Sequence, residues 1–231
     1  MWKETIVHYS RIMEKPKNWT SLEDFFHVLN EHVEYLVLRN FEELIEVGVN
    51  DDHPDIDLLC QDSKQLIQYS GSITRTGKQN DLIHQKILID GKTVSLDVRH
   101  VGDGYYDESW EKEMLEKRHL FHNMFYVMDE MNYYYSLLYH ALIQKKAMKP
   151  DYQSRLETMK DRLGISDPVE VNSLQKFMLE KGYLFTYPEN PEGIANFRIV
   201  DKSMIKRDLW KQFNRQLHRL KRNIIKILKT K

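Results

Sequence analysis

The sequence contains one cysteine, few residues that break regular structure and no long apolar run. Cys60 therefore has no partner for an internal disulfide, and its apolar neighbours predict a buried, inert thiol. The nine glycines and six prolines are not concentrated in a linker. No run approaches the roughly 20 apolar residues that a membrane-spanning helix needs, and the charged residues near the N-terminus argue against a signal peptide. We therefore expect a cytoplasmic protein, either free or held at the inner face of the membrane.

What the sequence does contain is ample material for a folded core. Hydrophobic residues make up 41% of the 231 positions and charged residues 30%, and the aromatic residues are four Trp, thirteen Tyr and nine Phe. This composition is typical of folded rather than disordered chains. The length suits one good-sized domain, or two small ones that share an interface.

The formal net charge of −1 hides an asymmetry along the chain. Residues 202–231 contain eleven Lys or Arg and a single acid, Asp208, which leaves residues 1–201 at −11. An acidic body suits a metal site and suits nucleic acid poorly. We therefore expect the main partner to be a small molecule rather than a nucleic acid.

The first half of the chain shows strand signals and the second half shows helix signals. Thr20 and Ser21 followed by Asp24 resemble a capping box, and Asp90-Gly91 is a strong signal for a two-residue hairpin turn. The strand-rich part predicts a helix at 20–34, strands at 35–39 and 55–60, a polar loop between these strands, and a hairpin at 84–101.

Apolar residues at intervals of three and four positions predict the later helices. These cover residues 108–117, 127–147, 151–163, 170–182 and 203–228, with a loop at 183–201 that includes a short strand at 197–200. Strands before helices indicate an α+β protein. We expect an α/β core over residues 1–115 and a helical region over residues 116–231.

Three carboxylates on two predicted strands are the most informative feature for function. Asp55 and Asp57 are separated by one residue, so on a strand their side chains point to the same face. Asp97 lies in the middle of the second arm of the hairpin, where an inward charge is costly unless it is neutralised. A divalent cation would neutralise it, and Mg²⁺ prefers carboxylate oxygens together with substrate phosphates.

The order of strand, loop, Asp-x-Asp strand, hairpin with a third aspartate and then helices resembles the nucleotidyltransferase fold of the DNA polymerase β superfamily. The resemblance covers roughly residues 30–150 and implies a mixed β-sheet with flanking helices, followed by a helical C-terminal region. Three segments are similar to bacterial proteins associated with surface-polysaccharide synthesis: residues 38–44 (LRNFEEL), 55–59 (DIDLL) and 97–107 (DVRHVGDGYYD).

The resemblance implies a metal-dependent transferase. Asp55, Asp57 and Asp97 would bind Mg²⁺ or Mn²⁺, and Asp97 would accept the proton of the acceptor hydroxyl. The donor would be a nucleotide or a nucleotide-activated small molecule, and the group transferred would be a nucleotidyl, phospho-alditol or sugar-phosphate group. The product would belong to a capsule, O-antigen or teichoic-acid-like glycan.

Two arginines are candidates to bind the phosphate of the substrate. Arg39 could clamp phosphate through its planar fork, and Arg99 shares the strand face of the third aspartate. The glycine-rich turn at 102–104 either lines the substrate or simply connects a strand to a helix. The remaining candidates for substrate contact are Asn40, Asp103 and Tyr105.

The chain departs from the superfamily at one place, which supports two alternative functions. A Gly-Gly or Gly-Ser pair usually opens a helix before the paired acids, and here the corresponding residues are Leu38-Arg39-Asn40. A binding module for nucleotides or glycans that keeps the fold without turnover is the first alternative. An RNA-directed enzyme, either tRNA-modifying or of the toxin type, is the second, with the basic tail as its docking element.

Two helical segments have both a structural and a functional interpretation. The aromatic residues at 133–135 and 139, with His140, have the spacing of core packing, although Tyr139 or Lys145 could reach a substrate. The tail at 203–229 has apolar and basic residues on different faces of a helix. Its apolar stripe could dock on the acidic body, the helix could make peripheral contact with an anionic membrane, or its basic face could bind nucleic acid.

Overall fold

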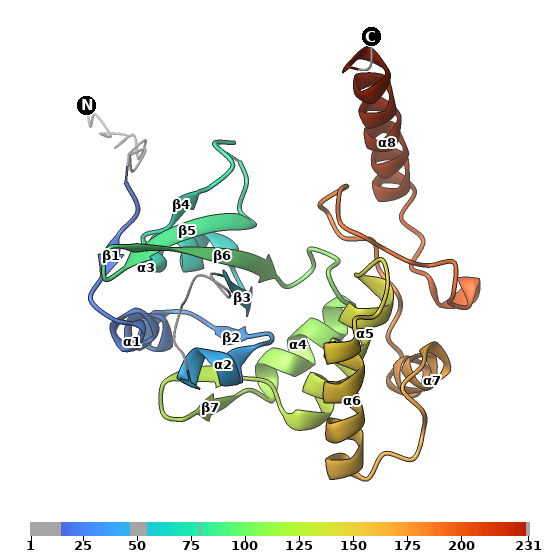
Figure 1. The fold of residues 1–231 in the computed structure, drawn as a ribbon, viewed down its shortest axis with the longest axis horizontal. Coiled ribbons are helices and arrows are strands. Elements are labelled where there is room, and N and C mark those ends of the chain that lie inside the picture. The colour runs from blue at the N-terminus through green and yellow to red at the C-terminus, as the bar shows by residue number, and fades with distance from the viewer. Residues whose placement is uncertain (1–14, 47–54, 79, 230–231) are drawn as a thin grey trace, which may run out of the picture.

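The computed structural model describes residues 15–46, 55–78 and 80–229. Figure 1 shows a β-sheet on one side of the molecule and a group of helices on the other. The strands are β1 (Asn18–Trp19), β2 (Tyr35–Val37), β3 (Asp55–Cys60), β4 (Ile73–Thr74), β5 (His84–Ile89), β6 (Lys92–His100), β7 (His119–Phe121) and β8 (Phe125–Val127). The helices are α1 (Leu22–His32), α2 (Phe41–Glu46), α3 (Ser63–Ser70), α4 (Glu108–Glu116), α5 (Glu130–Ile143), α6 (Pro150–Leu163), α7 (Val171–Lys181) and α8 (Leu209–Lys229), with a 3₁₀ turn at Lys202–Met204. The predicted α+β class is confirmed.

Within the described residues the strands form one mixed sheet in the order β1-β5-β6-β3-β2-β8-β7, and β4 pairs with β5 at one side. Strand β3 occupies the centre, parallel to β6 and antiparallel to β2. Every residue of β3 after Asp55 is buried, as its change from polar to apolar residues predicts. The Asp-x-Asp motif therefore lies where the central strand enters the core.

The local signals in the first half of the chain form the elements they predict. The Ser21 side chain caps α1 by accepting a hydrogen bond from the backbone N–H of Asp24, at 3.2 Å. The hairpin turns at Asp90 and Gly91, whose φ angles of 48° and 74° suit the tight turn that joins β5 to β6. Cys60 is fully buried, and burial raises the pKa of its thiol, as expected for an inert cysteine.

Several elements are formed by pairing that the sequence pattern does not reveal. The β7–β8 hairpin was not predicted, and β8 joins the sheet because Val127 pairs with Val37 of β2. The region predicted as helical thus also supplies two strands. The strand predicted at 197–200 is wrong, since those residues form turns in the structure. A bridge forms instead between Phe185 and Ile205, and the last helix begins at Leu209 rather than at residue 203.

The helices α4, α5, α6 and α7 share a core built on aromatic side chains, and Figure 1 shows them together beside the sheet. Trp110 is fully buried, stacks on Tyr183 at 5.5 Å, and donates from Nε1 to Asn132 at 2.8 Å. The aromatic group at 133–135 and 139 is buried with His140, so the core interpretation of this segment is confirmed. In the part of the chain that the structure describes, no helix combines the length and the apolarity needed to cross a membrane.

Candidate functional site

The three predicted carboxylates lie on one face of two neighbouring parallel strands. Asp57 of β3 is in register with Asp97 of β6, and Asp55 is in register with Ser95. Neighbouring strands are about 4.8 Å apart, and side chains at matching positions of parallel strands share a face. The structure therefore brings together the residues that the spacing of the sequence selected.

Two of the carboxylates are held by arginines. Arg39 Nη2 lies 2.6 Å from Asp57 Oδ1, and both side chains are about nine-tenths buried, at 11% and 10% exposed. Arg75 donates from Nη2 to Asp97 Oδ1 in a more open ion pair. Arg39 was predicted as a phosphate ligand, whereas Arg75 was not predicted at all. Arg75 follows the two-residue strand β4, and its backbone N–H donates to His84 O, which places it beside Asp97.

The donor atoms suit a hard cation, but the side chains in this structure do not surround one. Carboxylate oxygens are the ligands that Mg²⁺ prefers. Among residues 15–46, 55–78 and 80–229, however, no three acidic, histidine or cysteine side chains converge as a metal site would. The guanidinium groups of Arg39 and Arg75 supply positive charge at Asp57 and Asp97 instead. A cation shared by these carboxylates therefore requires the arginine side chains to turn away.

The electrostatics of Asp57 show how closely the charged groups are gathered. Burial raises the pKa of Asp57, Arg39 lowers it, and the charges of Asp97 and Asp55 raise it again, so that the pKa lies above its ordinary value. Burial alone would lower the pKa of Arg39, but Asp57 and then Tyr105 raise it well above its usual range. The charges of Arg39 and Asp57 thus act strongly on each other in a site that is largely shielded from water.

Tyr105 lies between the two predicted phosphate-binding arginines. The guanidinium carbon of Arg99 is 4.2 Å from the centre of the Tyr105 ring, and that of Arg39 is 5.8 Å away. The Tyr105 hydroxyl lies 3.4 Å from Nδ1 of His140 on α5. Burial raises the pKa of Tyr105, while the two arginines lower it, Arg39 most. Tyr105 thus links the sheet face to α5.

Asp103 supports this arrangement from within the core. Its side chain is 1% exposed, accepts a hydrogen bond from the Tyr105 backbone N–H at 2.7 Å, and lies 3.8 Å from Arg99 Nη1. Glu111 of α4, which sequence reasoning missed, holds the same turn by accepting from the backbone N–H groups of Gly102, at 2.7 Å, and Tyr106, at 3.0 Å. A signal was present, because Glu111 falls among the apolar residues on the buried face of its helix.

Asn40 lies in the turn between β2 and α2, and its side chain points to α6 rather than to the carboxylates. Its φ of 57° is left-handed, a conformation that glycine adopts most readily. Its Oδ1 accepts a hydrogen bond from Arg155 Nη1 of α6 at 3.1 Å. The side chain is thus held by α6 while the backbone turns Arg39 toward Asp57.

Two further residues weighed from the sequence take different places. Lys145, just after α5, lies within the electrostatic reach of the site: burial lowers its pKa, the charge of Arg39 lowers it further, and Asp57 raises it. Tyr139 is 1% exposed and packs between aromatic rings, so it does not reach a substrate. His53 lies beside the paired acids in the sequence and was also a candidate for substrate contact, but it lies outside the described residues.

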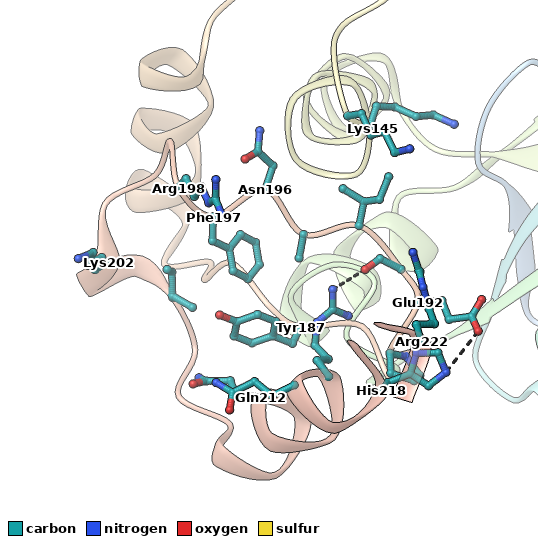
Figure 2. A pocket seen from close by; sticks show the side chains of 18 residues that line it. Lys145, Tyr187, Glu192, Asn196, Phe197, Arg198, Lys202, Gln212, His218 and Arg222 are labelled. Atoms are coloured by element: carbon teal, nitrogen blue, oxygen red, sulfur yellow. Dashed lines mark hydrogen bonds and ion pairs between the residues drawn. The ribbon is translucent and has the colours of Figure 1, made fainter. Parts of the chain in front are cut away.

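Beyond Lys145 a basic cleft opens between the end of α5, the 187–198 loop and α8, with a volume of about 870 Å³. Figure 2 shows Lys145 at one rim and His218 and Arg222 of α8 along another. Glu192 is the only acid among the described lining residues, and it lies 3.4 Å from His218. The lining cations are Lys145, Lys146, Arg198, Lys202, Arg215 and Arg222. Such a lining attracts anions.

Comparisons with protein-family models, with curated proteins and with solved structures gave no match for this chain. What the site does must therefore be inferred from its own residues and their geometry.

Proposed function

We propose that this protein is a metal-dependent transferase that moves a phosphate-bearing group from a nucleotide donor to a hydroxyl acceptor. The observation that carries the proposal is the register of Asp57 with Asp97, with Asp55 on the same face. This arrangement offers three carboxylates beside arginines that can neutralise phosphate, the combination that phosphoryl transfer needs. The donor would be a nucleotide or nucleotide-activated sugar or alditol.

One local feature of the structure supports the resemblance noted in the sequence. The turn at 38–40 joins β2 to the short helix α2, as the phosphate-cradling turn of a nucleotidyltransferase fold does, and Asn40 takes a glycine-like conformation there. A nucleotidyltransferase-like sheet is the finer fold assignment that we propose. On the same resemblance, the acceptor is a sugar or alditol hydroxyl in surface-glycan assembly.

The residues divide the chemistry between them. Asp55 and Asp57 would hold Mg²⁺ or Mn²⁺, which supplies charge neutralisation at the transferred group when bound. The acceptor oxygen forms a new bond to phosphorus, and the bond from phosphorus to the leaving phosphate oxygen breaks. The acceptor proton passes to Asp97. The leaving group departs as pyrophosphate from a nucleoside triphosphate, or as a nucleoside monophosphate from a nucleotide-activated alditol or sugar.

Arg39 and Arg75 would exchange partners when the substrate binds. In this structure each arginine neutralises a carboxylate. Phosphate oxygens are equally good partners for a guanidinium, so a bound substrate would draw the arginines from Asp57 and Asp97 and release both carboxylates. Anionic substrates would be attracted to the basic cleft that begins at Lys145.

The same ion pairs favour a second candidate function, a binding module without turnover. If Arg39 and Asp57 stay paired with ligand present, the site binds a phosphate-bearing ligand but assembles no metal centre. The basic cleft favours a third candidate, an RNA-directed transferase, because its six lining Lys and Arg residues would suit a polyanion.

One set of measurements separates the three. Mn²⁺ is titrated calorimetrically, with a nucleoside triphosphate present and against a protein-free blank, into wild type, Asp57→Asn and, as control, Asp161→Asn, which changes an exposed aspartate on α6. Nucleoside triphosphates and CDP- and UDP-linked sugars and alditols are then screened by thermal shift and for product. We expect metal binding that Asp57→Asn alone abolishes, and product with one donor class. Equal heats in wild type and Asp57→Asn would contradict the proposed metal site. Stabilisation by a ligand without formation of product would favour the binding module. Nucleic acid that co-purifies with the protein and is lost at high salt would favour the RNA-directed enzyme.

A further inference from the structure

Helix α8 turns its apolar face away from the protein. Leu209, Phe213, Leu217, Leu220 and Ile224 are spaced by three or four residues and therefore share one face. With Trp210, these side chains are between 39% and 81% exposed. Figure 1 shows α8 projecting away from the other helices. The apolar stripe is therefore not docked on the acidic body, which was one of the three interpretations of the tail.

The body instead holds the polar face of α8. Arg215 is 6% exposed and donates to the backbone oxygens of Asn190, at 3.2 Å, and Gly193. Four residues earlier, Lys211 Nζ lies 3.4 Å from the backbone oxygen of Asp103. Because these polar contacts fix the rotation of the helix, the apolar stripe faces solvent on the opposite side.

We infer that this apolar face binds a membrane surface that contains anionic lipids. The 21 residues of α8 include seven Lys or Arg and no acid. An amphipathic helix with a broad apolar face and a cationic polar face lies in the plane of a lipid interface, where apolar burial and attraction to anionic headgroups act together. Trp210 and Phe213 stand at the start of the stripe, and tryptophan is favoured at such interfaces.

A second copy of the chain fits this face less well. Two stripes packed together would join two helices that each carry seven positive charges and no acid, so the helices would repel each other. The described body also offers no matching apolar surface. Its other exposed large apolar side chains come from separate segments and are Leu120, Met131, Leu179, Ile194 and Ile199. A lipid surface with anionic headgroups buries the apolar stripe and also attracts the positive charges of the helix.

This attachment would also orient the basic cleft. The cleft is lined by the polar face of α8, through Gln212, Arg215 and Arg222, so it lies between the body and the lipid surface. An anionic ligand in the cleft would thus be held close to the membrane. The lipid contact itself does not depend on catalysis, so it stands or falls separately from the proposed transferase activity.

The test is co-sedimentation of the full chain with phosphatidylcholine vesicles, with and without phosphatidylserine, at low and high salt. The paired variant Trp210→Ser with Phe213→Ser removes two exposed side chains, 70% and 56% exposed, and Leu179→Ser is the matched control at 70% exposed on α7. We expect wild type and the control to bind vesicles with phosphatidylserine at least about tenfold better than vesicles without it. We expect the paired variant to lose about tenfold or more of that binding.

Folding and self-association are followed in the same samples by circular dichroism and by size-exclusion chromatography with light scattering. Helix content should be unchanged in the paired variant, because both side chains are exposed. No preference for anionic vesicles, or equal binding by wild type and the paired variant, would overturn the inference. So would a wild-type dimer that the paired variant abolishes in the absence of any vesicle binding, since the second copy would then be the occupant.

Discussion

Asp57 and Asp97 stand at matching positions of two parallel strands, and a different arginine holds each of them. Like charges at neighbouring positions repel, which the raised pKa of Asp57 reflects after burial and Arg39 have acted on it. Gathering these charges in a buried site lowers the stability of the fold, so stability does not explain the arrangement. Its four charged groups are, however, suited to exchange partners with a phosphate and a cation.

Substitutions of Arg39 and Asp57 should have strongly non-additive effects on the free energy of unfolding. Arg39→Ala leaves a carboxylate that is 10% exposed without its partner, so the free energy of unfolding should fall by about 3–5 kcal/mol. Adding Asp57→Asn should recover part of that loss, because the buried charge is removed. Urea unfolding measures both, and Arg162→Ala, which breaks an exposed ion pair with Glu130, should change stability by less than about 1 kcal/mol. Additive effects of the two substitutions would contradict the coupling.

Glu111 should matter more than any other acid on α4. Glu111→Ala leaves the buried backbone N–H groups of Gly102 and Tyr106 without acceptors, so we expect a loss of about 2–4 kcal/mol in unfolding free energy. Glu108→Ala, on the same helix but exposed and paired with Lys112, should leave the free energy of unfolding nearly unchanged. Similar losses for both variants would show that the turn at 102–106 does not depend on Glu111.

Glu113 should give the protein a measurable dependence on acid pH. Burial raises its pKa, but hydrogen bonds from Lys117, Tyr183 and Lys181 prevail and lower the pKa from 4.5 to about 2. A carboxyl with a lowered folded-state pKa stabilises the fold above its unfolded value of 4.5, and this contribution disappears as the pH falls toward 2. The stability difference between wild type and Glu113→Gln should therefore shrink by about 1 kcal/mol over that range. A difference that stays constant with pH in urea titrations would contradict this assignment.

Two glycines with similar backbone angles should respond differently to alanine. Gly104 and Gly91 have φ of 79° and 74°, so alanine is strained at both, by about 1 kcal/mol. At Gly104 the added Cβ would also collide with the Tyr187 carbonyl oxygen, whereas at Gly91 nothing lies within 4 Å. We expect Gly104→Ala to cost a further 1–3 kcal/mol, about the usual penalty of overpacking. Equal melting temperatures of the two variants would show that the backbone at Tyr187 shifts to make room for the added Cβ.

The basic cleft should bind anions through charge. Arg198→Ala with Lys202→Ala removes two exposed lining cations, so affinity for pyrophosphate should fall by about tenfold at low salt and by less at high salt. Isothermal calorimetry gives both values. The control is Lys176→Ala, which removes an exposed cation of α7 that pairs with Asp167. It should leave the affinity for pyrophosphate unchanged. Unchanged pyrophosphate binding in the cleft variant would place the anion site elsewhere.

The sequence predicted much of the fold because the signals are local. The cap at Ser21, the Asp90-Gly91 turn and the apolar periodicity of α4 to α7 each act within a few residues. The alternation in β3 was enough to place Asp55 and Asp57 on one strand face. Strands as short as β4 and β7 carry too few residues for a period, so they were missed.

By itself, the sequence determined the residue types of the site, the strand that carries its paired acids, and the two faces of the C-terminal helix. Only the tertiary structure decided that Arg75 neutralises Asp97, that Glu111 holds the turn at 102–106, and that α8 docks by its polar face. The physical reason is range. Periodicity fixes which residues share a face, but the partner of that face depends on contacts between residues far apart in the chain, which no local pattern encodes.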